Sequence, residues 1–241
     1  MKIIVCKNYD EMSAEIAKII AKQVKDKPDC VLGLATGSTP VGAYGELAAM
    51  YNKGELDFSL VKSYNLDEYY PMRADDIHSY HYFMDENLFS KINIKRENIH
   101  VPNGDTDTPD EECAAYEAEI NAAGGIDLQL LGIGRNGHIG FNEPDEYLIP
   151  DTHKTALTKD TMEANARFFE DGGTMPDSAV TMGMGTILRA KKVVIAASGA
   201  SKREAVAGLI AGRLTTKLPA SLLALHSDVI LVCDEDAYCG K

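Results

Sequence analysis

Short apolar runs alternate along the chain with longer stretches in which apolar residues recur at helical spacing. The runs have the length and composition of buried strands, which we expect at 2–6, 30–35, 61–66, 99–101, 126–131, 154–158, 179–182, 192–197 and 229–233. The helical spacing predicts helices over 10–25, 40–53, 79–92, 110–123, 159–169 and 202–211. This alternation predicts an α/β fold with a doubly wound, mainly parallel, Rossmann-like sheet and with sites at the carboxyl ends of its strands.

Several predicted helix ends carry residues that favour them. Asn8 or Asp10 suits the cap of the first helix, and two glycines follow the helix at 110–123. Ser38 or Thr39 suits the cap of the second helix, with Pro40 in its first position.

The composition is that of one soluble enzyme domain. The chain has 241 residues, of which 45% are hydrophobic and 25% charged, and we expect a single domain over 1–241 because no linker divides it. No apolar run reaches the length of a membrane span, and the first residues suit a strand better than a signal peptide. Of five cysteines, Cys6, Cys30 and Cys233 lie in strand-like runs, which indicates buried thiols in a reducing cytoplasm; the exposure of Cys239 is not predicted.

A formal net charge of −13 sets conditions on any partner. It disfavours nucleic acids and anionic membranes, because their charge has the same sign. An anionic small molecule would have to be held at short range by a few local cations or helix N-termini. Individual lysines and arginines at strand ends are therefore informative.

The most informative stretch is GIGRNGHIGFNEP at 132–144, directly after an apolar run. Its glycines break the strand pattern and predict a tight loop. The loop holds four polar side chains of kinds that position or move protons, namely Asn136, His138, Asn142 and Glu143. A loop that leaves the carboxyl end of a parallel strand is where open α/β sheets bind ligands. The alternative is an ordinary glycine-rich turn with a structural histidine.

Three further features suit an anion. The turn of Gly37, Ser38 and Thr39 lies between a strand and a helix start, where backbone N–H groups can face a phosphate. Lys202 opens another helix after a small-residue turn and opposes its dipole, which favours a bound anion over a stabilising role. Arg167 lies among apolar neighbours, which is unusual unless it reaches a carboxylate or phosphate. Ser and Thr also cap helices that bind no ligand, so a purely structural role stays open for the turn of Gly37, Ser38 and Thr39.

Two carboxylates, Asp67 and Glu68, follow the strand at 61–66. Asp67 ends the apolar run and is the stronger site candidate, whereas Glu68 equally suits a helix start. An aspartate that is ionised at neutral pH can abstract a proton made acidic by a carbonyl, and a histidine oriented by a carboxylate can carry protons to a sugar ring oxygen. His78 and His81 show no metal-binding spacing and are interpreted as structural.

No cofactor or metal motif accompanies these residues in the sequence. GIGRNG has the letters of a dinucleotide fingerprint, but it lies mid-chain and no acidic ribose partner ends the next strand. A Walker lysine, an HExxH motif and a nucleophile elbow are also missing. We therefore expect an acid–base enzyme, without metal or organic cofactor, that acts on a small phosphorylated molecule.

Taken together, the motifs resemble those of the glucosamine-6-phosphate deaminase family, aldose–ketose isomerases that also release ammonia. The resemblance covers nearly the whole chain and rests on ATGSTP at 35–40, NLDEY at 65–69, GIGRNGHIGFNEP at 132–144, ANARFF at 164–169 and SGASK at 198–202. It implies conversion of glucosamine 6-phosphate and water to fructose 6-phosphate and ammonia, in amino-sugar catabolism.

The resemblance also implies a role for each matching residue. Asp67 would take the proton from C2 of the open-chain sugar and return it at C1. His138 would open the pyranose ring, assisted by Glu143 and supported by Asn136. The phosphate would be bound by Gly37, Ser38, Thr39, Arg167 and Lys202.

Some features depart from the family pattern. Many members have aspartate where this chain has Asn136, and we expect Glu143 to be the main group that orients His138 here. The resemblance implies that allosteric members, which are activated by N-acetylglucosamine 6-phosphate, have basic residues at the positions of His153 and Thr155. Those members also have a longer C-terminal tail. We expect a non-allosteric enzyme with a lid at about 144–170, monomeric, with a homo-oligomer as the alternative.

Two other functions stay open. A 6-phosphogluconolactonase resembles this fold and shares a glycine-rich loop with a histidine, but it has no need of a carbanion base at Asp67. A non-catalytic sugar-phosphate sensor would need the phosphate-binding residues without the proton-transferring Asp67, His138 and Glu143. Activity on the amino sugar separates both from a deaminase.

Overall fold

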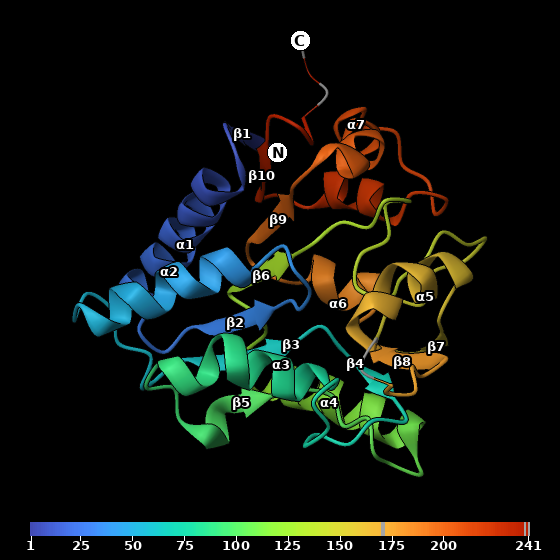
Figure 1. Ribbon diagram of the computed structural model, residues 1–241, viewed down its shortest axis with the longest axis horizontal. Helices are drawn as coiled ribbons and strands as arrows, with labels where there is room; N and C mark the ends of the chain where they lie inside the picture. Colours follow the sequence, from blue (N-terminus) through green and yellow to red (C-terminus); the bar gives the residue numbers. More distant parts are fainter. Residues whose placement is uncertain (170–171, 239, 241) are drawn as a thin grey trace.

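The computed structural model of the chain describes residues 1–169, 172–238 and 240, apart from the side chains of Ala164 and Arg167. Its centre is a seven-stranded parallel sheet in the order β1-β10-β9-β6-β2-β3-β5 (Figure 1). The strands are β1 (Lys2–Cys6), β2 (Val31–Leu34), β3 (Lys62–Asn65), β5 (Ile99–His100), β6 (Leu128–Leu131), β9 (Val193–Ala197) and β10 (Val229–Asp234). The parallel sheet predicted from the sequence is confirmed.

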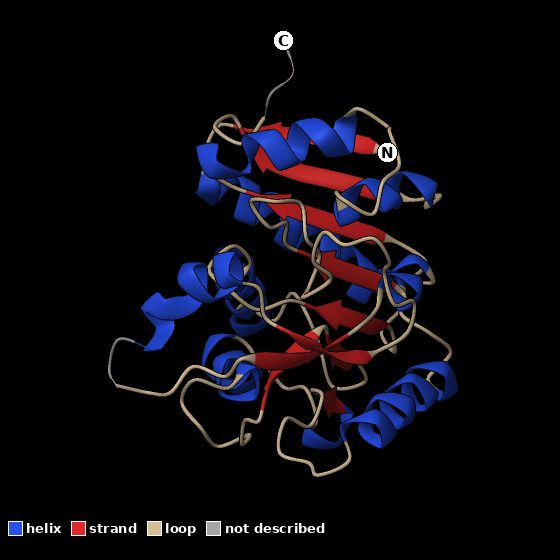
Figure 2. Cartoon of the chain, turned by 90° about the vertical axis from the view of Figure 1, so that its right-hand side faces the viewer, coloured by secondary structure: helices blue, strands red, loops and turns tan. Residues whose placement is uncertain are grey.

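Helices lie on both sides of this sheet, as Figure 2 shows. The α-helices are α1 (Tyr9–Asp26), α2 (Val41–Asn52), α3 (Tyr80–Asn87), α4 (Pro109–Ala122), α5 (Lys159–Asn165), α6 (Met184–Leu188) and α7 (Arg203–Ile210). Short 3₁₀ helices are η1 (Phe89–Lys91), η2 (Arg96–Asn98), η3 (Ala166–Phe169), η4 (Ala200–Lys202) and η5 (Pro219–Leu225). Buried residues of α1, α2 and α3 share a hydrophobic cluster with one face of the sheet, and those of α4, α6 and α7 share another with the opposite face. The fold is therefore doubly wound, as predicted.

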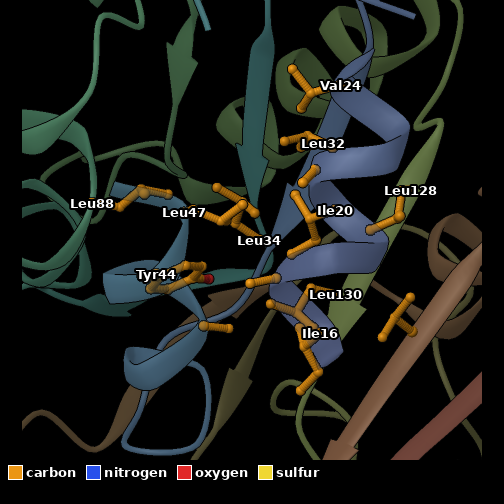
Figure 3. Packing of buried hydrophobic residues seen from close by; sticks show 14 of the residues in the cluster. Ile16, Ile20, Val24, Leu32, Leu34, Tyr44, Leu47, Leu88, Leu128 and Leu130 are labelled. Atoms are coloured by element: carbon orange, nitrogen blue, oxygen red, sulfur yellow. The ribbon is translucent and has the colours of Figure 1, made fainter. Parts of the chain in front are cut away.

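The packing of α1 explains why its sequence forms a helix on this face. Ile16, Ile20 and Val24 recur every fourth residue and form one buried stripe. The stripe packs on apolar side chains of the sheet, among them Leu32 and Leu34 of β2 (Figure 3). Full burial of each such aliphatic side chain contributes about 1.5–3 kcal/mol through its removal from water. The start of α1 is fixed as predicted, because the Asn8 side chain accepts a hydrogen bond from a backbone N–H of the first turn.

A second sheet, antiparallel and three-stranded, has the order β4-β8-β7, with β4 (Asp67–Tyr70), β7 (His153–Ala156) and β8 (Ser178–Thr181). The expectation that the strands at 154–158 and 179–182 join the parallel sheet is wrong. Only Leu66 separates β3 from β4, and a parallel neighbour in the same sheet would require a long crossover. The chain therefore leaves the main sheet at Leu66 and starts the second sheet with Asp67.

Several helix ends differ from the sequence-based expectation. Pro40 occupies the cap position of α2, and no side chain makes a capping hydrogen bond there. The expectation that Ser38 or Thr39 caps this helix is therefore wrong. The helix expected at 79–92 ends as α3 at Asn87 and is followed by η1, and the helix expected at 159–169 divides into α5 and η3. The predicted helices nevertheless follow one another in the expected order.

The cysteines fit the sequence-based expectation where they are described. Cys6, Cys30 and Cys233 are buried as predicted, as is Cys113, whereas Cys239 lies outside the described residues. Among the helices of the described ranges, none combines the length and the apolar composition needed to cross a membrane.

Candidate active site

A cavity of about 380 Å³ opens at the carboxyl ends of the central strands. Its wall is built by the turn after β2, the start of β4, α3 with the residues just before it, the loop after β6, the segment around α5 and the turn after β9. The predicted site residues in this wall are Gly37, Ser38, Thr39, Asp67, His138 and Lys202. Asn136 and Glu143 contact His138 from outside the wall. The side chain of Arg167 lies outside the described part of the chain, so its predicted phosphate contact stays a prediction.

The turn after β2 combines a special backbone conformation with a brace from α1. Gly37 has a φ of 90°, a conformation that residues with a Cβ atom rarely adopt. The Tyr9 hydroxyl donates a hydrogen bond to the Ser38 carbonyl oxygen over 3.0 Å and accepts one from the Gly42 N–H over 2.9 Å. The turn leads into α2, and N–H groups at a helix start carry partial positive charge. This region of the wall therefore suits an anion such as a phosphate.

The turn after β9 carries Lys202 and is fixed by Asp234, the last residue of β10. The Asp234 carboxylate accepts hydrogen bonds from the Ser198 hydroxyl over 2.5 Å and from the Gly199 N–H over 3.0 Å. It also accepts one from the Ala237 N–H over 2.8 Å. Asp234 is 5% exposed, so these contacts replace water as its hydrogen-bond partners. The buried carboxylate thus holds the turn that presents Lys202 to the cavity.

Asp67 lies in the cavity wall with only 6% of its surface exposed. Burial, to which the Glu68 carboxylate adds, raises the pKa of Asp67 to about 8. Asp67 is therefore mostly protonated at neutral pH, whereas an ordinary aspartate is ionised there. A pKa in this range makes the ionised form a stronger base than an ordinary aspartate, which suits the abstraction of a weakly acidic proton.

Gly140 allows the loop after β6 to approach Asp67 closely. Its φ is 58°, and a Cβ atom placed on it would lie 3.3 Å from Oδ2 of Asp67. The same Cβ atom would lie 2.9 Å from Oγ1 of Thr181, which accepts a hydrogen bond from the Phe141 N–H over 3.1 Å. A side chain at position 140 would therefore push this loop away from the carboxylate.

Glu68 faces away from the cavity, because successive residues of a strand point to opposite sides. Its carboxylate, 2% exposed, accepts hydrogen bonds from the N–H groups of Tyr69, Tyr80 and His81, each over 2.9 Å. The last two N–H groups belong to the first turn of α3, whose positive end favours a carboxylate. Burial raises the pKa of Glu68 to about 7, although the three hydrogen bonds act in the opposite direction. Glu68 thus anchors a helix start, which was the structural alternative for this residue.

His138, Asn136 and Glu143 form one connected group. Nδ1 of His138 lies 3.3 Å from Oε2 of Glu143, at an ion-pair distance but without the alignment of a hydrogen bond. Asn136 donates a hydrogen bond from Nδ2 to the same Oε2 over 2.8 Å. Its Oδ1 accepts a hydrogen bond from the His138 N–H over 3.1 Å. Glu143 therefore faces the imidazole ring, while Asn136 holds both the carboxylate and the backbone of His138.

Two threonines that the sequence did not single out complete the surroundings of Glu143. The Thr158 hydroxyl donates a hydrogen bond to Oε1 of Glu143 over 3.3 Å, and the Thr161 hydroxyl donates one to the same oxygen. Burial acts to raise the pKa of Glu143, but His138, Thr161 and Asn136 together lower it to about 2. Glu143 is therefore ionised at neutral pH and can stabilise a positive charge on His138.

The α5 segment also reaches the other side of the cavity. Asn165 donates a hydrogen bond to the Tyr69 hydroxyl over 3.1 Å, and Phe169 packs edge-on against the Tyr69 ring. The same Phe169 ring stacks on His78 at 4.7 Å between centroids. His78 thus has a packing role in the wall, although the sequence pointed to no partner for it. Within the ranges that the structure describes, no three His, Cys, Asp or Glu side chains gather as a metal ion would require.

The comparison with known proteins assigns the chain to a family. Residues 7–232 match the family model described as glucosamine-6-phosphate isomerases/6-phosphogluconolactonase. The chain belongs to this family. The family resemblance inferred from the motifs is therefore confirmed.

Individual members of the family differ in how similar they are to the chain. Glucosamine-6-phosphate deaminases of Thermoanaerobacter sp. (strain X514) and Clostridium perfringens (strain ATCC 13124) are each 56% identical over 237 residues, or 98% of this chain, and 94% and 98% of their own lengths are covered. The solved structure of a monomeric glucosamine-6-phosphate deaminase is 44% identical with a TM-score of 0.95, and 98% of each chain is covered. A 6-phosphogluconolactonase of Thermotoga maritima has a TM-score of 0.76 at 20% identity, with 97% of this chain and 98% of that chain covered. The last likeness concerns the fold alone.

Proposed function

We propose that the protein converts D-glucosamine 6-phosphate and water to D-fructose 6-phosphate and ammonia, a reaction of amino-sugar catabolism. Deaminases that are 56% identical over 98% of the chain support this activity. The observation that carries it is the placement of Asp67 and His138 in the wall of one cavity, with Glu143 against the histidine. A lactonase or a sensor has no use for the carbon base that Asp67 would supply.

The phosphate group would lie between the turn of Gly37, Ser38 and Thr39 and the side chain of Lys202. Both belong to the cavity wall, and both supply positive charge or N–H donors at short range. Arg167 is proposed as a further phosphate ligand on the strength of its motif. These local donors would offset the repulsion between a phosphate dianion and a chain with a net charge of −13.

Ring opening would begin the reaction. A proton has to move from the C1 hydroxyl of the pyranose to the ring oxygen, and a histidine can both accept and donate it near neutral pH. His138 would perform this transfer, because its imidazolium form can donate a proton to the ring oxygen and then take one from the C1 hydroxyl. The ionised Glu143, 3.3 Å from Nδ1, would stabilise this imidazolium. The product of this step is the open-chain aldehyde.

Isomerisation would then depend on Asp67 in its ionised form. Asp67 takes the proton from C2, the electron pair forms the C1–C2 double bond, and the imidazolium form of His138 protonates the C1 oxygen. Asp67 returns its proton to C1, which leaves an iminium group at C2. Water adds to C2 and gives one proton back to His138, and ammonia then departs, so that C2 becomes the ketone of fructose 6-phosphate. The Asp67 pKa of about 8 suits this cycle, because the carboxylate must both take and return a proton.

The first experiment measures fructose 6-phosphate and ammonia formed from glucosamine 6-phosphate by wild type, Asp67→Asn and Asp107→Asn. Asp107 is exposed and lies outside the cavity wall, so it controls for the loss of one carboxylate. We expect equal amounts of both products from wild type and from the control, and a rate lower by about 10²–10⁴-fold for Asp67→Asn. Binding without turnover by wild type would identify a sensor, and hydrolysis of 6-phosphogluconolactone would identify a lactonase. Normal turnover by Asp67→Asn would assign the base to another residue.

Residues 144–170 are proposed to act as a lid over the substrate. Asp160, Thr161, Asn165 and Phe168 of this segment line the cavity, which supports the assignment. A monomer is proposed as the working form, because the structurally similar deaminase with 44% identity is monomeric.

A further inference from the structure

The two carboxylate oxygens of Glu143 serve different parts of the chain. Oε2 faces the loop after β6, where it contacts His138 and Asn136. Oε1 faces the start of α5, where it accepts hydrogen bonds from the hydroxyls of Thr158 and Thr161. The Glu143 side chain is only 11% exposed, so protein groups supply most of its hydrogen bonds. A displacement of α5 would therefore change the surroundings of the carboxylate that faces His138.

Thr161 makes the more specific of the two threonine contacts. It is 3% exposed, whereas Thr158 is half-buried. Thr158 also caps α5, and its hydroxyl oxygen accepts a hydrogen bond from the Thr161 N–H over 3.3 Å. The Thr161 hydroxyl thus forms a buried link between α5 and Glu143.

Another contact between the same two segments is weaker. Arg135 of the loop after β6 lies 3.2 Å from Asp160 of α5, but about half of each side chain is exposed. Ion pairs of this kind contribute about 0–1 kcal/mol because water and salt screen them. The ion pair can keep the segments near each other, but it does not orient Glu143.

The other end of α5 is attached across the cavity. Asn165 donates its hydrogen bond to Tyr69, two residues after Asp67 on β4. The short helix therefore extends from the group around His138 to the strand that carries the proposed base. Because α5 lines the cavity between these two places, a bound sugar phosphate would meet it directly.

We propose that Thr161 is a positioning residue that couples the placement of α5 to proton transfer by His138. With α5 in place, the Thr161 hydroxyl holds Glu143 with Oε2 against the imidazole. With α5 displaced, Oε1 loses this donor, and Glu143 becomes free to turn away from the ring. The inference rests on the proposed roles of His138 and Glu143 and adds a dependence of their chemistry on α5.

The test uses Thr161→Val, which removes the hydroxyl and keeps the shape, and Thr161→Ser, which keeps the hydroxyl. Thr155→Val is the matched control, because Thr155 lies on β7 just before α5 and its hydroxyl contacts a backbone carbonyl instead. We expect Thr161→Val to lower kcat about 10- to 100-fold, the size of a lost hydrogen bond to a charged group, with KM within about 3-fold. Thr161→Ser should recover most of kcat, and Thr155→Val should resemble wild type.

Two further measurements separate positioning from simple stability. The NMR titration of the Glu143 carboxyl should move to higher pH in Thr161→Val, because the Thr161 hydroxyl is one of the groups that lower the pKa of Glu143. Thr161→Val should also add little to the loss caused by Glu143→Gln, because both act on the same group. A thermal melt of each variant shows whether the fold is kept.

The outcomes distinguish this inference from the function on which it rests. If Glu143→Gln is impaired but Thr161→Val has normal kcat and an unchanged Glu143 titration, the coupling is wrong and the proposed catalytic group stands. Equal losses in Thr161→Val and Thr161→Ser would show a packing role and overturn the inference. A fully active Glu143→Gln would overturn both the catalytic assignment and the coupling.

Discussion

Asn136 donates its hydrogen bond to Oε2 of Glu143, the oxygen that faces Nδ1 of His138. In the variant Asn136→Asp this contact would bring two carboxylates to 2.8 Å, where the wild type has an amide donor. Repulsion would disfavour two ionised groups, while the added negative charge would favour the imidazolium. Asn136 therefore keeps Glu143 ionised beside the histidine without adding charge of its own.

We predict that Asn136→Asp retains kcat within about 10-fold of wild type. Glu143→Gln should lower kcat by about 10²-fold or more, because it removes the charge that faces His138. Measurement of kcat for both variants checks this. Equal and large losses in both would contradict the view that Glu143 is the main group that orients the ring.

The pKa of Asp67 predicts opposite effects of pH on activity and stability. The base must be ionised, so kcat/KM should rise as the pH increases from 6 toward about 8, the pKa of Asp67. In Asp67→Asn the remaining activity should lack this rise. A profile of kcat/KM between pH 5 and 9 for both proteins measures the effect.

The stability effect follows from proton linkage. Folding raises the Asp67 pKa from 3.8 to about 8, so the folded protein binds this proton more tightly than the unfolded chain does. The contribution of Asp67 to stability is therefore complete below pH 4 and is lost as the pH rises toward 8. Asp67→Asn should raise Tm at pH 8, by about 2–4 °C for each kcal/mol gained, and change it little at pH 4. A lower Tm of the variant at pH 8 would mean that the carboxylate is stabilised by contacts in the fold.

Lys202 and Asp234 should affect substrate binding in the same direction. Lys202→Ala would remove a charge-assisted contact and raise KM about 10- to 100-fold, with a small change in Tm. Asp234→Asn would loosen the turn at Ser198 and Gly199 and raise KM less, but it should lower Tm because a buried hydrogen-bonding group is changed. Steady-state kinetics and thermal melts check both. An unchanged KM with a lower Tm in Lys202→Ala would show that Lys202 is structural.

Gly140→Ala should damage the site through geometry alone. The new Cβ atom would meet Thr181 and Asp67, and the φ of 58° would add about 1–2 kcal/mol of strain. We expect kcat to fall at least about 10-fold with a lower Tm. The control is Gly45→Ala on α2, where a Cβ atom would meet no neighbour within 4 Å. Normal activity in Gly140→Ala would show that the loop can move without harm to the base.

The expectation that the enzyme is not allosterically activated has a test of its own. His153 and Thr155, the positions at which the motif resemblance implies basic residues in allosteric members, lie on β7. We expect hyperbolic kinetics and no change in KM on addition of N-acetylglucosamine 6-phosphate. Light scattering should give a mass close to 26.2 kDa, the mass of one chain. A larger mass together with sigmoidal kinetics would contradict both expectations.

The main sheet and most of the cavity wall could be predicted from the sequence for a physical reason. Strands buried on both faces are continuous apolar runs, and glycine-rich turns mark where they end. Asp67, His138 and Lys202 each follow such a run, so the topology alone places them at one edge. The strands β7 and β8 were predicted, but β4 was not, because it is four residues long and begins with two carboxylates. Without β4, the pattern gave no reason to expect a second sheet.

The surroundings of Glu143 could not be predicted in the same way. Thr158 and Thr161 lie 15 and 18 residues after Glu143 in the sequence. The chain between Glu143 and these threonines forms a strand of the second sheet, and no spacing rule predicts a contact across such a segment. The raised pKa of Asp67 could not be predicted from the sequence either, because it depends on burial and on the Glu68 charge rather than on residue type.

Asp67 and Glu68 are neighbours on β4, yet one lines the cavity and the other anchors α3. A strand alternates its sides with a period of two, so a shift of β4 by one residue would exchange the two carboxylates. Glutamate would then enter the cavity, and the shorter aspartate would face the N–H groups of α3. Insertions or deletions of one residue between β3 and β4 should therefore be absent among active variants of this chain, even where single substitutions are tolerated.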